Sequence, residues 1–327
     1  MARVSVVICA YTDERWDDLV AAVDSVDRQT TSALETIVVV DHNPALLDRV
    51  RAGLPGVVAV ENGEASGLSG ARNSGIAASA GDVVAFLDDD AVAAEDWLEH
   101  IVRSYREPDV VGVGGAVEPL WVGGERRSFP DEFRWVVGCT YRGMPEQTSR
   151  VRNAIGANMS FRREIFDAIG GFRSGIGRVG TRPVGCEETE LSIRVRQRYP
   201  SAVVLYEPRA RVRHRVPASR TRFSYFLSRC YAEGLSKALV TRLAGARDGL
   251  SSERSYMLRT LPRGVANGLR DAVLGRDGHG LARAAWIVAG LATTTCGYAI
   301  GRLRGATTER TTFRPGSSAP APESVHA

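Results

Sequence analysis

The sequence predicts an α/β fold: a mostly parallel, Rossmann-like sheet flanked by helices, followed by a C-terminal helical extension. Two apolar, β-branched runs, Val4–Ala10 and Thr36–Val40, have the composition of parallel strands that are buried on both faces. Between these runs, Leu19, Val23 and Val26 recur at helical spacing. Strands that alternate with helices form βαβ units, and consecutive units of this kind build a parallel sheet.

The same alternation continues through the first ninety residues. The patterns predict a helix over Arg15–Gln29, a break at Asn43-Pro44, a helix over Ala45–Ala52, a strand over Val57–Val60, a helix from about Ser69 and a fourth buried strand over Val83–Leu87. Acidic residues follow the first, second and fourth strands. Because parallel strands end at the same edge of a sheet, these carboxylates are expected to lie together there.

The second half of the chain is more varied. The patterns predict a helix over Ala93–Tyr105, a strand within residues 108–115, an aromatic segment over Pro119–Gln147 beside the site, a strand over Asn153–Phe161, a helix over Arg163–Ile169, a mobile glycine-rich loop over Arg173–Gly185, a helix over Cys186–Arg198 and a strand over Val203–Glu207. Residues Ala210–His214 then lead into a basic region. Beyond Arg222 the spacing is helical.

Charge is divided between the two halves of the chain. Residues 1–100 contain 18 Asp or Glu against 6 Arg, whereas residues 194–276 contain 18 Arg or Lys against 5 Asp or Glu. The acidic part suits a metal ion, and the basic part suits phosphate, an anionic lipid surface or nucleic acid. The five cysteines are scattered without a C-x-x-C pair. This usage indicates a reducing, cytoplasmic compartment rather than a disulfide framework or structural zinc.

Several classes of protein are excluded by residues that the chain lacks. A P-loop NTPase needs G-x-x-x-x-G-K-[ST], and a dehydrogenase needs G-x-G-x-x-G after its first strand. Neither pattern is found there. Phosphatases that use a D-x-D motif carry it at the first strand and usually need a catalytic lysine, whereas Lys237 is the only lysine here. The basic stretch contains no recognisable nucleic-acid module, so no nucleic-acid partner is expected.

Three consecutive carboxylates, Asp88, Asp89 and Asp90, follow the fourth strand. Like charges at the end of an apolar strand repel one another, so each carboxylate must stay hydrated or paired. A divalent cation with a phosphate beyond it removes this cost, and Mg²⁺ or Mn²⁺ prefers carboxylate oxygens together with substrate phosphates. The structural alternative is a solvated acidic turn that caps the following helix.

Five segments within residues 3–216 form a pattern: VSVVICAYTDE, VVVDHNP, GLSGARNSGIAASAGDVVAFLDDD, GANMSFRREIFDAIGGF and EETELSIRVR. In this order and spacing they resemble the family 2 glycosyltransferases of GT-A fold, although each motif is weak by itself. Within that family, the chain looks similar to bacterial enzymes that act on polyprenyl- or dolichyl-linked sugars. The resemblance implies displacement of a nucleoside diphosphate from a sugar by an acceptor hydroxyl, with inversion at the anomeric carbon.

The resemblance also implies roles for individual residues. The implied substrate-binding residues are Ala10, Tyr11, Glu14, Asp41, Arg72, Asp88 and Asp89, and the implied ligands of a Mg²⁺ or Mn²⁺ ion are Asp90, Asp88 and His214. The first four hold the base, expected to be uracil, while Asp88 lies on the ribose and Asp89 shares either task. Each role has a structural alternative: Asp41 as a turn former, Arg72 as a surface arginine and His214 as a structural histidine.

The family places its catalytic carboxylate at the start of a later helix, usually within a Glu-Asp pair. Here the pair is Glu187-Glu188, and Glu188 matches the usual Asp. This departure leaves open which of the two is the base. The base takes the proton of the acceptor hydroxyl, which typically contributes ~10²–10⁴-fold to the rate. The alternative is a pair of helix N-terminal charges without a catalytic role.

The predicted organisation is a nucleotide-sugar and acceptor domain over residues 1–216, a basic helical extension over 217–304 and a disordered tail over 305–327. Residues 284–301 are uncharged and flanked by arginines. They are expected to lie on a membrane rather than to span it or to pack internally. The expected acceptor is a glycan or a lipid-linked sugar at an anionic inner membrane face. The rival hypothesis is a non-catalytic sugar-nucleotide or membrane-surface binding protein, which the acceptor-side carboxylates disfavour.

Overall fold

The computed structural model of the chain describes residues 2–174, 185–245 and 255–312. Its strands are β1 (Val4–Ala10), β2 (Glu35–Val40), β3 (Val58–Glu61), β4 (Val83–Asp88), β5 (Ala91–Ala93), β6 (Val110–Val122), β7 (Ser149–Val151), β8 (Asn158–Arg162) and β9 (Val203–Pro217). They form one sheet in the order β3-β2-β1-β4-β8-β6-β9-β5, and β7 pairs with β9. The predicted α/β class is confirmed.

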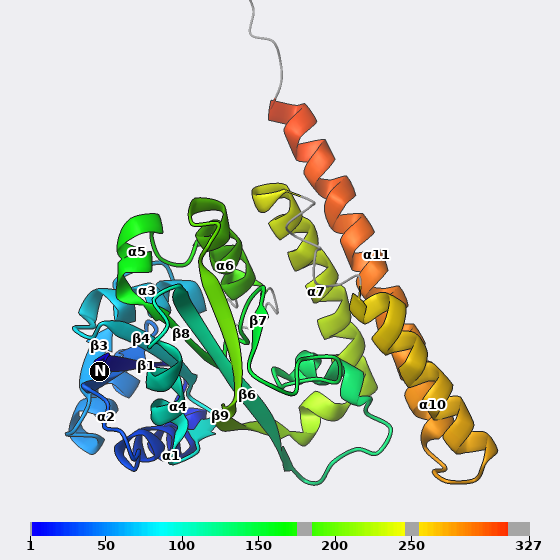
Figure 1. Cartoon of the computed structure of the whole chain (residues 1–327), viewed down its shortest axis with the longest axis horizontal. Coiled ribbons are helices and arrows are strands. Elements are labelled where there is room, and N and C mark those ends of the chain that lie inside the picture. Colours follow the sequence, from blue (N-terminus) through cyan, green and yellow to red (C-terminus); the bar gives the residue numbers. More distant parts are fainter. Residues whose placement is uncertain (1, 175–184, 246–254, 313–327) are drawn as a thin grey trace, which may run out of the picture.

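Helices flank this sheet, and a group of them stands to one side of it (Figure 1). The longer helices are α1 (Trp16–Asp27), α2 (Pro44–Gly53), α3 (Leu68–Ala78), α4 (Trp97–Ser104), α5 (Arg163–Ile169), α6 (Glu187–Arg198), α7 (Phe223–Ala244), α10 (Leu261–Val273) and α11 (Gly280–Thr312). The short helical turns are η1 (Asp13–Arg15), η2 (Asp131–Val137), η3 (Ala218–Thr221) and η4 (Tyr256–Thr260). The predicted C-terminal helical extension is therefore present as α7, η4, α10 and α11.

The sheet has two hydrophobic faces because successive residues of each strand point to opposite sides. On one face, Ile8 of β1 shares a core cluster with apolar residues of α1, α2 and α4. On the other face, Val7 shares a cluster with residues of α3, α5 and α6. Both side chains are almost fully buried. This burial explains why the first strand reads as a continuous apolar run rather than as an alternating one.

Strand direction changes across the sheet. β1 pairs in parallel with both β2 and β4, and β2 pairs in parallel with β3. β8 then pairs antiparallel with β4 and with β6, whereas the long strands β6 and β9 run parallel to one another. Parallel pairing therefore builds the part of the sheet where the first, second and fourth strands end together, as the sequence predicted.

Several predicted elements have other bounds in the structure: the strand predicted over Asn153–Phe161 begins only at Asn158, and the strand predicted within residues 108–115 continues to Val122. The helix expected from Ala93 begins at Trp97, because Ala91–Ala93 forms strand β5 and pairs with β9. The strand expected at 203–207 continues to Pro217 as β9. Residues 175–184 of the predicted glycine-rich loop lie outside the described residues.

Aromatic side chains join the extension to the rest of the molecule. The ring of Phe226 on α7 lies 5.2 Å from that of Phe133 in η2 and 5.0 Å from that of Trp286 on α11. Phe226 and Phe133 are both buried. The extension therefore shares the hydrophobic core of the sheet and packs internally in part. Helix α11 runs to Thr312, past residue 305 where the tail was expected to begin, and residues 313–327 lie outside the described residues.

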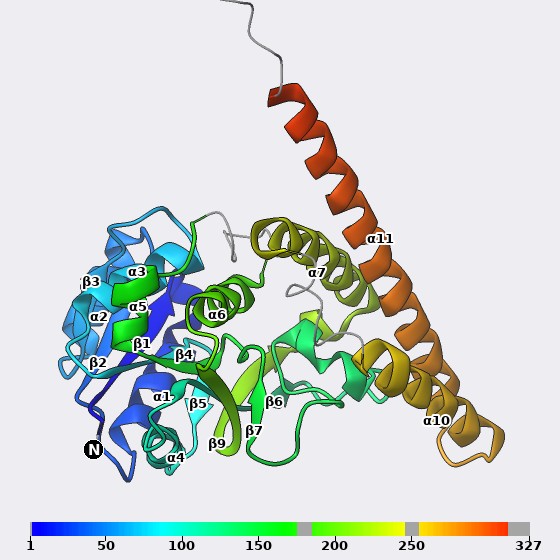
Figure 2. The ribbon, with the colours of Figure 1, turned by 45° about the horizontal axis from the view of Figure 1, so that its top comes forward.

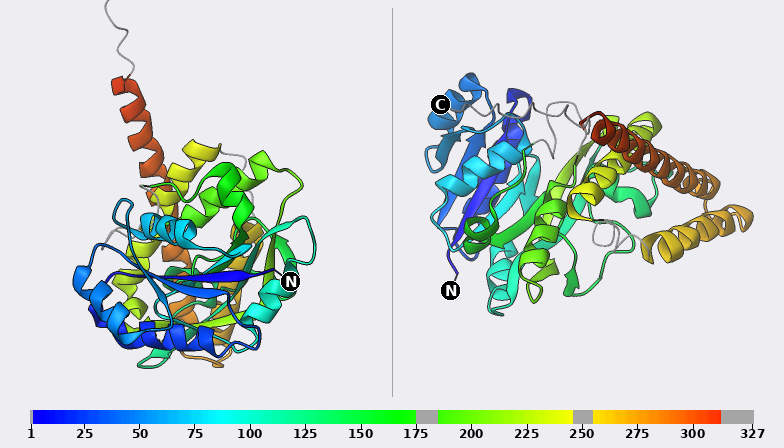
Figure 3. Two further views of the ribbon diagram at one scale, coloured as in Figure 1. Left: turned by 90° about the vertical axis from the view of Figure 1, so that its left-hand side faces the viewer. Right: turned by 90° about the horizontal axis from the view of Figure 1, so that it is seen from above.

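Helix α11 contains one stretch, Gly280–Arg304, that is long and apolar enough to cross a membrane by length and composition alone. One side of α11 packs along α7, and the helix stands away from the sheet when the molecule is seen from above (Figure 3). Only 22% of its apolar window is buried. Leu281 and Val288 are among its exposed apolar side chains. One side of α11 is therefore covered by protein, and another side is open.

Candidate active site

The acidic turn after β4 meets a histidine from β9. Strand β5 pairs with β9 so that Ala91 lies opposite His214, and this register brings the imidazole Nε2 to 2.9 Å from Asp90 Oδ1. One possible ligand atom from each of Asp88, Asp90 and His214 lies within 4.8 Å of the others. Two carboxylate oxygens and one imidazole nitrogen at one point fit a divalent cation such as Mn²⁺ or Mg²⁺. The structure thus brings together the predicted ligand set.

Arginines surround the same turn. Arg15 Nη1 lies 2.8 Å from Asp89 Oδ1 and 3.1 Å from Asp90 Oδ2, and Arg220 Nη2 lies 3.6 Å from Asp90 Oδ2. Burial opposes ionisation of Asp90, but His214, Arg15 and Arg220 outweigh it and hold the pKa of Asp90 below its ordinary value. Burial and the charge of Asp90 raise the pKa of Asp89 to about 7. Asp89 is engaged by Arg15, a residue for which the sequence offered no role.

The pKa of His214 is shifted in the opposite direction to that of Asp90. Burial opposes its positive charge, but the Asp90 carboxylate outweighs burial and raises the pKa of His214 to about 10. On the other side of the ring, Nδ1 lies 3.9 Å from Cys139 Sγ. The imidazole is therefore held between a carboxylate and a thiol. A ring fixed in this way keeps one nitrogen directed at the acidic turn.

The residues implied for the nucleotide base lie at the ends of β1 and β2. The Asp41 N–H donates to the Ala10 carbonyl over 2.8 Å, which aligns the two strand ends. The Asp41 carboxylate accepts from Asn62 Nδ2 at 2.6 Å and from the Gly67 N–H at 2.9 Å. Tyr11 is 44% exposed at this edge. The structure thus gathers Ala10, Tyr11 and Asp41, and it adds Asn62, which no motif indicated.

The Arg72 guanidinium is buried and paired, so it is not free to face this edge of the sheet. It is buried, its Nη1 lies 2.8 Å from Glu187 Oε1, and its Nη2 lies 3.7 Å from Asp88 Oδ1. Nη2 also donates to the carbonyl of Gly156 over 3.0 Å. Arg72 therefore links the start of α6 to the end of β4. The surface-arginine alternative is wrong, because the guanidinium is enclosed between two acidic groups.

Glu187 and Glu188 begin helix α6, where the helix dipole favours acidic residues. Cys186 precedes them with φ +74°, a left-handed conformation that costs a non-glycine residue on the order of 1–3 kcal/mol. Burial, followed by repulsion from Glu187, raises the pKa of Glu188 to about 8. A carboxyl group whose pKa lies near neutral pH is suited to accept a proton.

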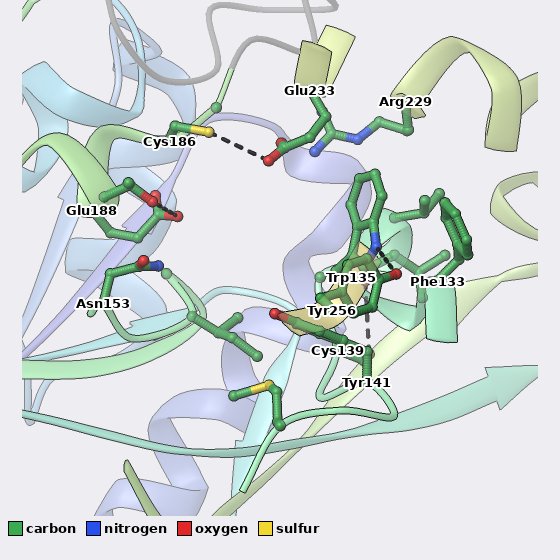
Figure 4. A pocket seen from close by; sticks show the side chains of 18 of the residues that line it. Phe133, Trp135, Cys139, Tyr141, Asn153, Cys186, Glu188, Arg229, Glu233 and Tyr256 are labelled. Carbon is green, nitrogen blue, oxygen red and sulfur yellow. Dashed lines mark hydrogen bonds between the residues drawn. The ribbon is translucent and has the colours of Figure 1, made fainter. Parts of the chain in front are cut away.

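A cavity of about 750 Å³ connects these groups to the extension. Asp88, Glu188 and His214 line it together with aromatic residues of the segment after β6. Figure 4 shows Glu188 and Asn153 on one side and Trp135 and Tyr256 on the other. The predicted position of the aromatic segment beside the site is confirmed for the part that includes Trp135.

The extension supplies lining residues that the sequence analysis did not single out. They are Tyr225, Arg229, Glu233 and Lys237 of α7, Tyr256 of η4, and Leu291, Thr294 and Tyr298 of α11. The indole of Trp135 donates to the hydroxyl of Tyr256 over 3.1 Å, which joins the two walls of the cavity. The i, i+4, i+8 spacing of Arg229, Glu233 and Lys237 places them on one face of a helix and was the one available signal.

Residues 5–170 match the family model described as glycosyl transferase family 2. The chain belongs to this family. It is 40% identical over 245 residues to the glucosyl-dolichyl phosphate glucuronosyltransferase of Haloferax volcanii, covering 74% of this chain and 78% of the relative. It is also 24% identical over 275 residues to the succinoglycan biosynthesis protein ExoM of Rhizobium meliloti, covering 78% and 84%.

Two solved structures of glycosyltransferases are similar in fold to this chain. The mannosyltransferase PcManGT from Pyrobaculum calidifontis, in complex with GDP-Man and Mn²⁺, superposes with a TM-score of 0.59 at 18% identity and covers 92% of this chain and 87% of its own. GalNAc-T7 with UDP, GalNAc and Mn²⁺ gives 0.52 at 19% identity, covering 79% and 56%. The family 2 glycosyltransferase described here therefore has the predicted GT-A fold. Its family match ends at residue 170, before Glu187, Glu188 and His214.

Proposed function

We propose that this glycosyltransferase moves a sugar from a nucleoside-diphosphate sugar, with UDP as the expected nucleotide, to an acceptor hydroxyl with inversion. The observation that carries the proposal is the shared cavity of Asp88, His214 and Glu188. In this arrangement a metal-binding carboxylate and a proton acceptor face the same space. The proposed metal-dependent, inverting transfer uses both groups around one anomeric carbon.

The proposed metal is Mn²⁺ or Mg²⁺, held by Asp88, Asp90 and His214. Mn²⁺ accompanies the nucleotide in both solved structures named above. When bound, the ion neutralises the charge that grows on the leaving diphosphate. The protein contributes Arg15 and Arg220, which lie 3.1 Å and 3.6 Å from Asp90 and keep this carboxylate ionised. An ionised carboxylate is the form that binds a cation.

Glu188 is the proposed base. Its carboxylate takes the proton of the acceptor hydroxyl, the hydroxyl oxygen bonds to the anomeric carbon, and the bond from that carbon to the diphosphate oxygen breaks. One displacement inverts the configuration and requires no covalent enzyme intermediate. The ion pair between Glu187 and Arg72 at 2.8 Å favours this assignment, because it already engages the Glu187 carboxylate with a partner inside the protein.

The proposed nucleotide site lies at the ends of β1 and β2. Asp41 offers carboxylate oxygens that can accept from a base N–H, and the exposed ring of Tyr11 offers a surface for stacking. Ala10 and Glu14 border the same edge. The preference for uridine is the least constrained part of the proposal, since the two solved structures contain different nucleotides, GDP-Man and UDP.

The proposed acceptor is a lipid-linked sugar of the dolichyl or polyprenyl phosphate type. The Haloferax relative carries such an acceptor in its name, glucosyl-dolichyl phosphate. In this chain the cavity has an apolar and aromatic wall from η2 and α11, with Arg229 and Lys237 of α7 beside it. An isoprenoid chain suits the apolar wall, and the lipid phosphate suits the two cations.

The extension offers a surface for peripheral contact with an anionic membrane. Exposed apolar side chains gather around the turn between α10 and α11: Leu269, Val273, Leu274 and Leu281. Arg270 and Arg276 are exposed near the same turn. Apolar residues beside arginines are typical of segments that lie at an anionic lipid interface. The proposed location is the cytoplasmic side of the membrane.

The test is a transfer assay with a panel of sugar nucleotides, Mn²⁺ and a glucosyl polyprenyl phosphate in detergent. The expected result is a lipid-linked disaccharide from one sugar nucleotide, with loss of activity after chelation. The anomeric configuration of the transferred sugar in the product, compared with its configuration in the donor, distinguishes inversion from retention. Failure of every sugar nucleotide to bind in the presence of Mn²⁺ would overturn the proposal and favour a different role for the fold.

A further inference from the structure

Helix α7 of the extension contacts the start of α6 through two hydrogen bonds. The N–H of Gly185 donates to Ser236 Oγ over 3.1 Å, and the thiol of Cys186 donates to Glu233 Oε1 over 3.6 Å. Glu233 and Ser236 are three residues apart and so lie on the same face of α7. Figure 2 shows α6 and α7 as neighbours, and Figure 4 shows the contact between Cys186 and Glu233 at the cavity.

The start of α6 lacks the local interactions that usually fix a helix N-terminus. Cys186 is the N-cap residue, and no side-chain capping hydrogen bond is formed there within the described chain. Its left-handed backbone is unfavourable for a residue with a Cβ atom. Such a conformation persists only when surrounding structure holds it. The surrounding structure here is α7, because Cys186 forms a buried cluster with Ile193 of α6 and Val240 of α7.

The protons of the Cys186 thiol and the Ser236 hydroxyl are placed as these two hydrogen bonds require. Burial, followed by the charge of Glu233, raises the pKa of Cys186 well above its ordinary value, so its thiol keeps the proton that it donates. Lys237 Nζ lies 3.3 Å from Glu233 Oε1, so the oxygen that accepts from the thiol also has a cationic neighbour. Ser236 is buried and donates its own proton to the carbonyl of Ala232, which leaves the oxygen lone pairs toward Gly185.

We propose that Glu233 and Ser236 are positioning residues for the catalytic carboxylate, so that the C-terminal extension completes the active site. The inference rests on the proposed function of Glu188, which follows Cys186 by two residues. Holding residues 185 and 186 fixes where α6 begins and therefore where Glu188 meets the acceptor hydroxyl. Misplacement of a reacting group by about 1 Å can lower a rate about 10²-fold.

The test compares Ser236→Ala and Glu233→Leu with Glu233→Gln in the full chain. The first two variants remove an acceptor, whereas the amide oxygen of Gln still accepts from the thiol. The expected result is a loss of kcat of at least about tenfold in the first two variants, with the KM for the sugar nucleotide unchanged and with activity largely kept in Glu233→Gln. Amide hydrogen exchange over residues 187–190 is expected to become faster in the same two variants.

Thr241→Val is the matched control. Thr241 is a buried hydroxyl on the same helix, and it donates to the carbonyl of Lys237 rather than to α6. An equal loss of kcat in this control, or wild-type kcat and exchange in Ser236→Ala and Glu233→Leu, would overturn the inference. Exchange is measured without substrate, so the positioning role fails or holds even if wild-type protein transfers no sugar. Lack of transfer by wild-type protein counts against the proposed function alone.

Discussion

The N-terminal sheet and the C-terminal extension hold their chemistry-bearing side chains in different ways. In the sheet, chemistry-bearing residues stand directly after strands, so the backbone hydrogen bonds that build β1, β2 and β4 also align Ala10, Asp41 and Asp88. In the extension, lining residues project from helices that are held by aromatic contacts such as that of Phe226 with Phe133. In the proposed function, the strand ends hold the donor, and the helix faces of the extension form the wall that meets the acceptor.

The largest expected effect tests the base at the boundary of these two regions. Glu188→Gln keeps the size of the side chain and removes its proton affinity, so kcat is expected to fall about 10²–10⁴-fold. Affinity for the sugar nucleotide, measured by calorimetry with Mn²⁺, is expected to survive. Glu187→Gln is the comparison. If it loses kcat in this way while Glu188→Gln remains nearly normal, the two roles must be exchanged.

The pH profile sharpens the same prediction. A base acts when deprotonated, and the pKa of Glu188 is raised to about 8. Below that value, kcat/KM is therefore expected to rise about tenfold per pH unit, and Glu188→Gln is expected to remove this rise. In the absence of substrate the raised pKa also means that ionised Glu188 opposes folding. This stability cost is absent below the ordinary pKa of a glutamate and grows as the pH rises toward 8.

The second effect concerns the sheet region alone. Asp90→Asn keeps the shape of the side chain and removes its charge, so metal-dependent binding of UDP and transfer are expected to fall on the order of 10²–10³-fold. Calorimetric titration of UDP with and without Mn²⁺ measures this change. Asp96→Asn is a control, because Asp96 pairs with His100 outside the cavity. Unchanged metal-dependent affinity in Asp90→Asn would remove the metal assignment.

A third effect concerns the extension alone. A Cβ atom at Gly234 of α7 would meet the carbonyl of Thr294 and the backbone of Tyr298 on α11. Helix propensity predicts that Gly234→Ala gains about 1 kcal/mol, whereas overpacking predicts a loss of about 1–3 kcal/mol. We expect the loss, measured as a lower Tm. Gly278→Ala is the control, since a Cβ atom there meets nothing within 4 Å. A higher Tm for Gly234→Ala would mean that the two helices are not closely packed.

The smallest expected effect tests the proposed lipid contact. Val273 and Leu274 are 84% and 55% exposed at the turn between α10 and α11. Replacing both with Glu is expected to weaken binding to anionic vesicles at low salt about tenfold or more, because apolar burial is lost and like charges are added. Co-sedimentation with vesicles measures it. Failure of the wild-type protein to bind such vesicles at low salt would contradict the proposal that this turn contacts a membrane.

The sheet region was largely predictable from sequence, because its strands are buried on both faces and end at the catalytic edge. Apolar runs located β1, β2 and β4, and the family resemblance implied that His214 joins Asp88 and Asp90, but the pairing of β5 with β9 that brings them together was not predicted. The antiparallel direction of β8 was not predicted, because β8 is as fully buried as the parallel strands and its sequence resembles theirs. Strand β5 was not predicted either, and its last residue, Ala93, was assigned to the following helix.

The contacts of the extension escaped prediction for a different reason. Trp135 meets Tyr256 across 121 positions of the sequence, and Cys186 meets Glu233 across 47. These pairs depend on how whole helices pack against one another, and no periodic pattern in the sequence predicts them. Residues such as Glu233 look like ordinary charges on a solvated helix face until α6 is placed beside them. Local patterns therefore predicted the residues at the strand ends, whereas the contacts of the extension became evident only from the tertiary structure.

The pairing of Asp90 with His214 also has a consequence for the order of synthesis. His214 follows Asp90 by 124 residues. At a translation rate of about 5–20 residues per second, the acidic turn leaves the ribosome roughly 6–25 s before its histidine partner. During that interval the turn has Arg15 as a counter-charge, but neither His214 nor Arg220 has been made. The proposed cation site can therefore close only after β9 has been made, because β9 carries His214.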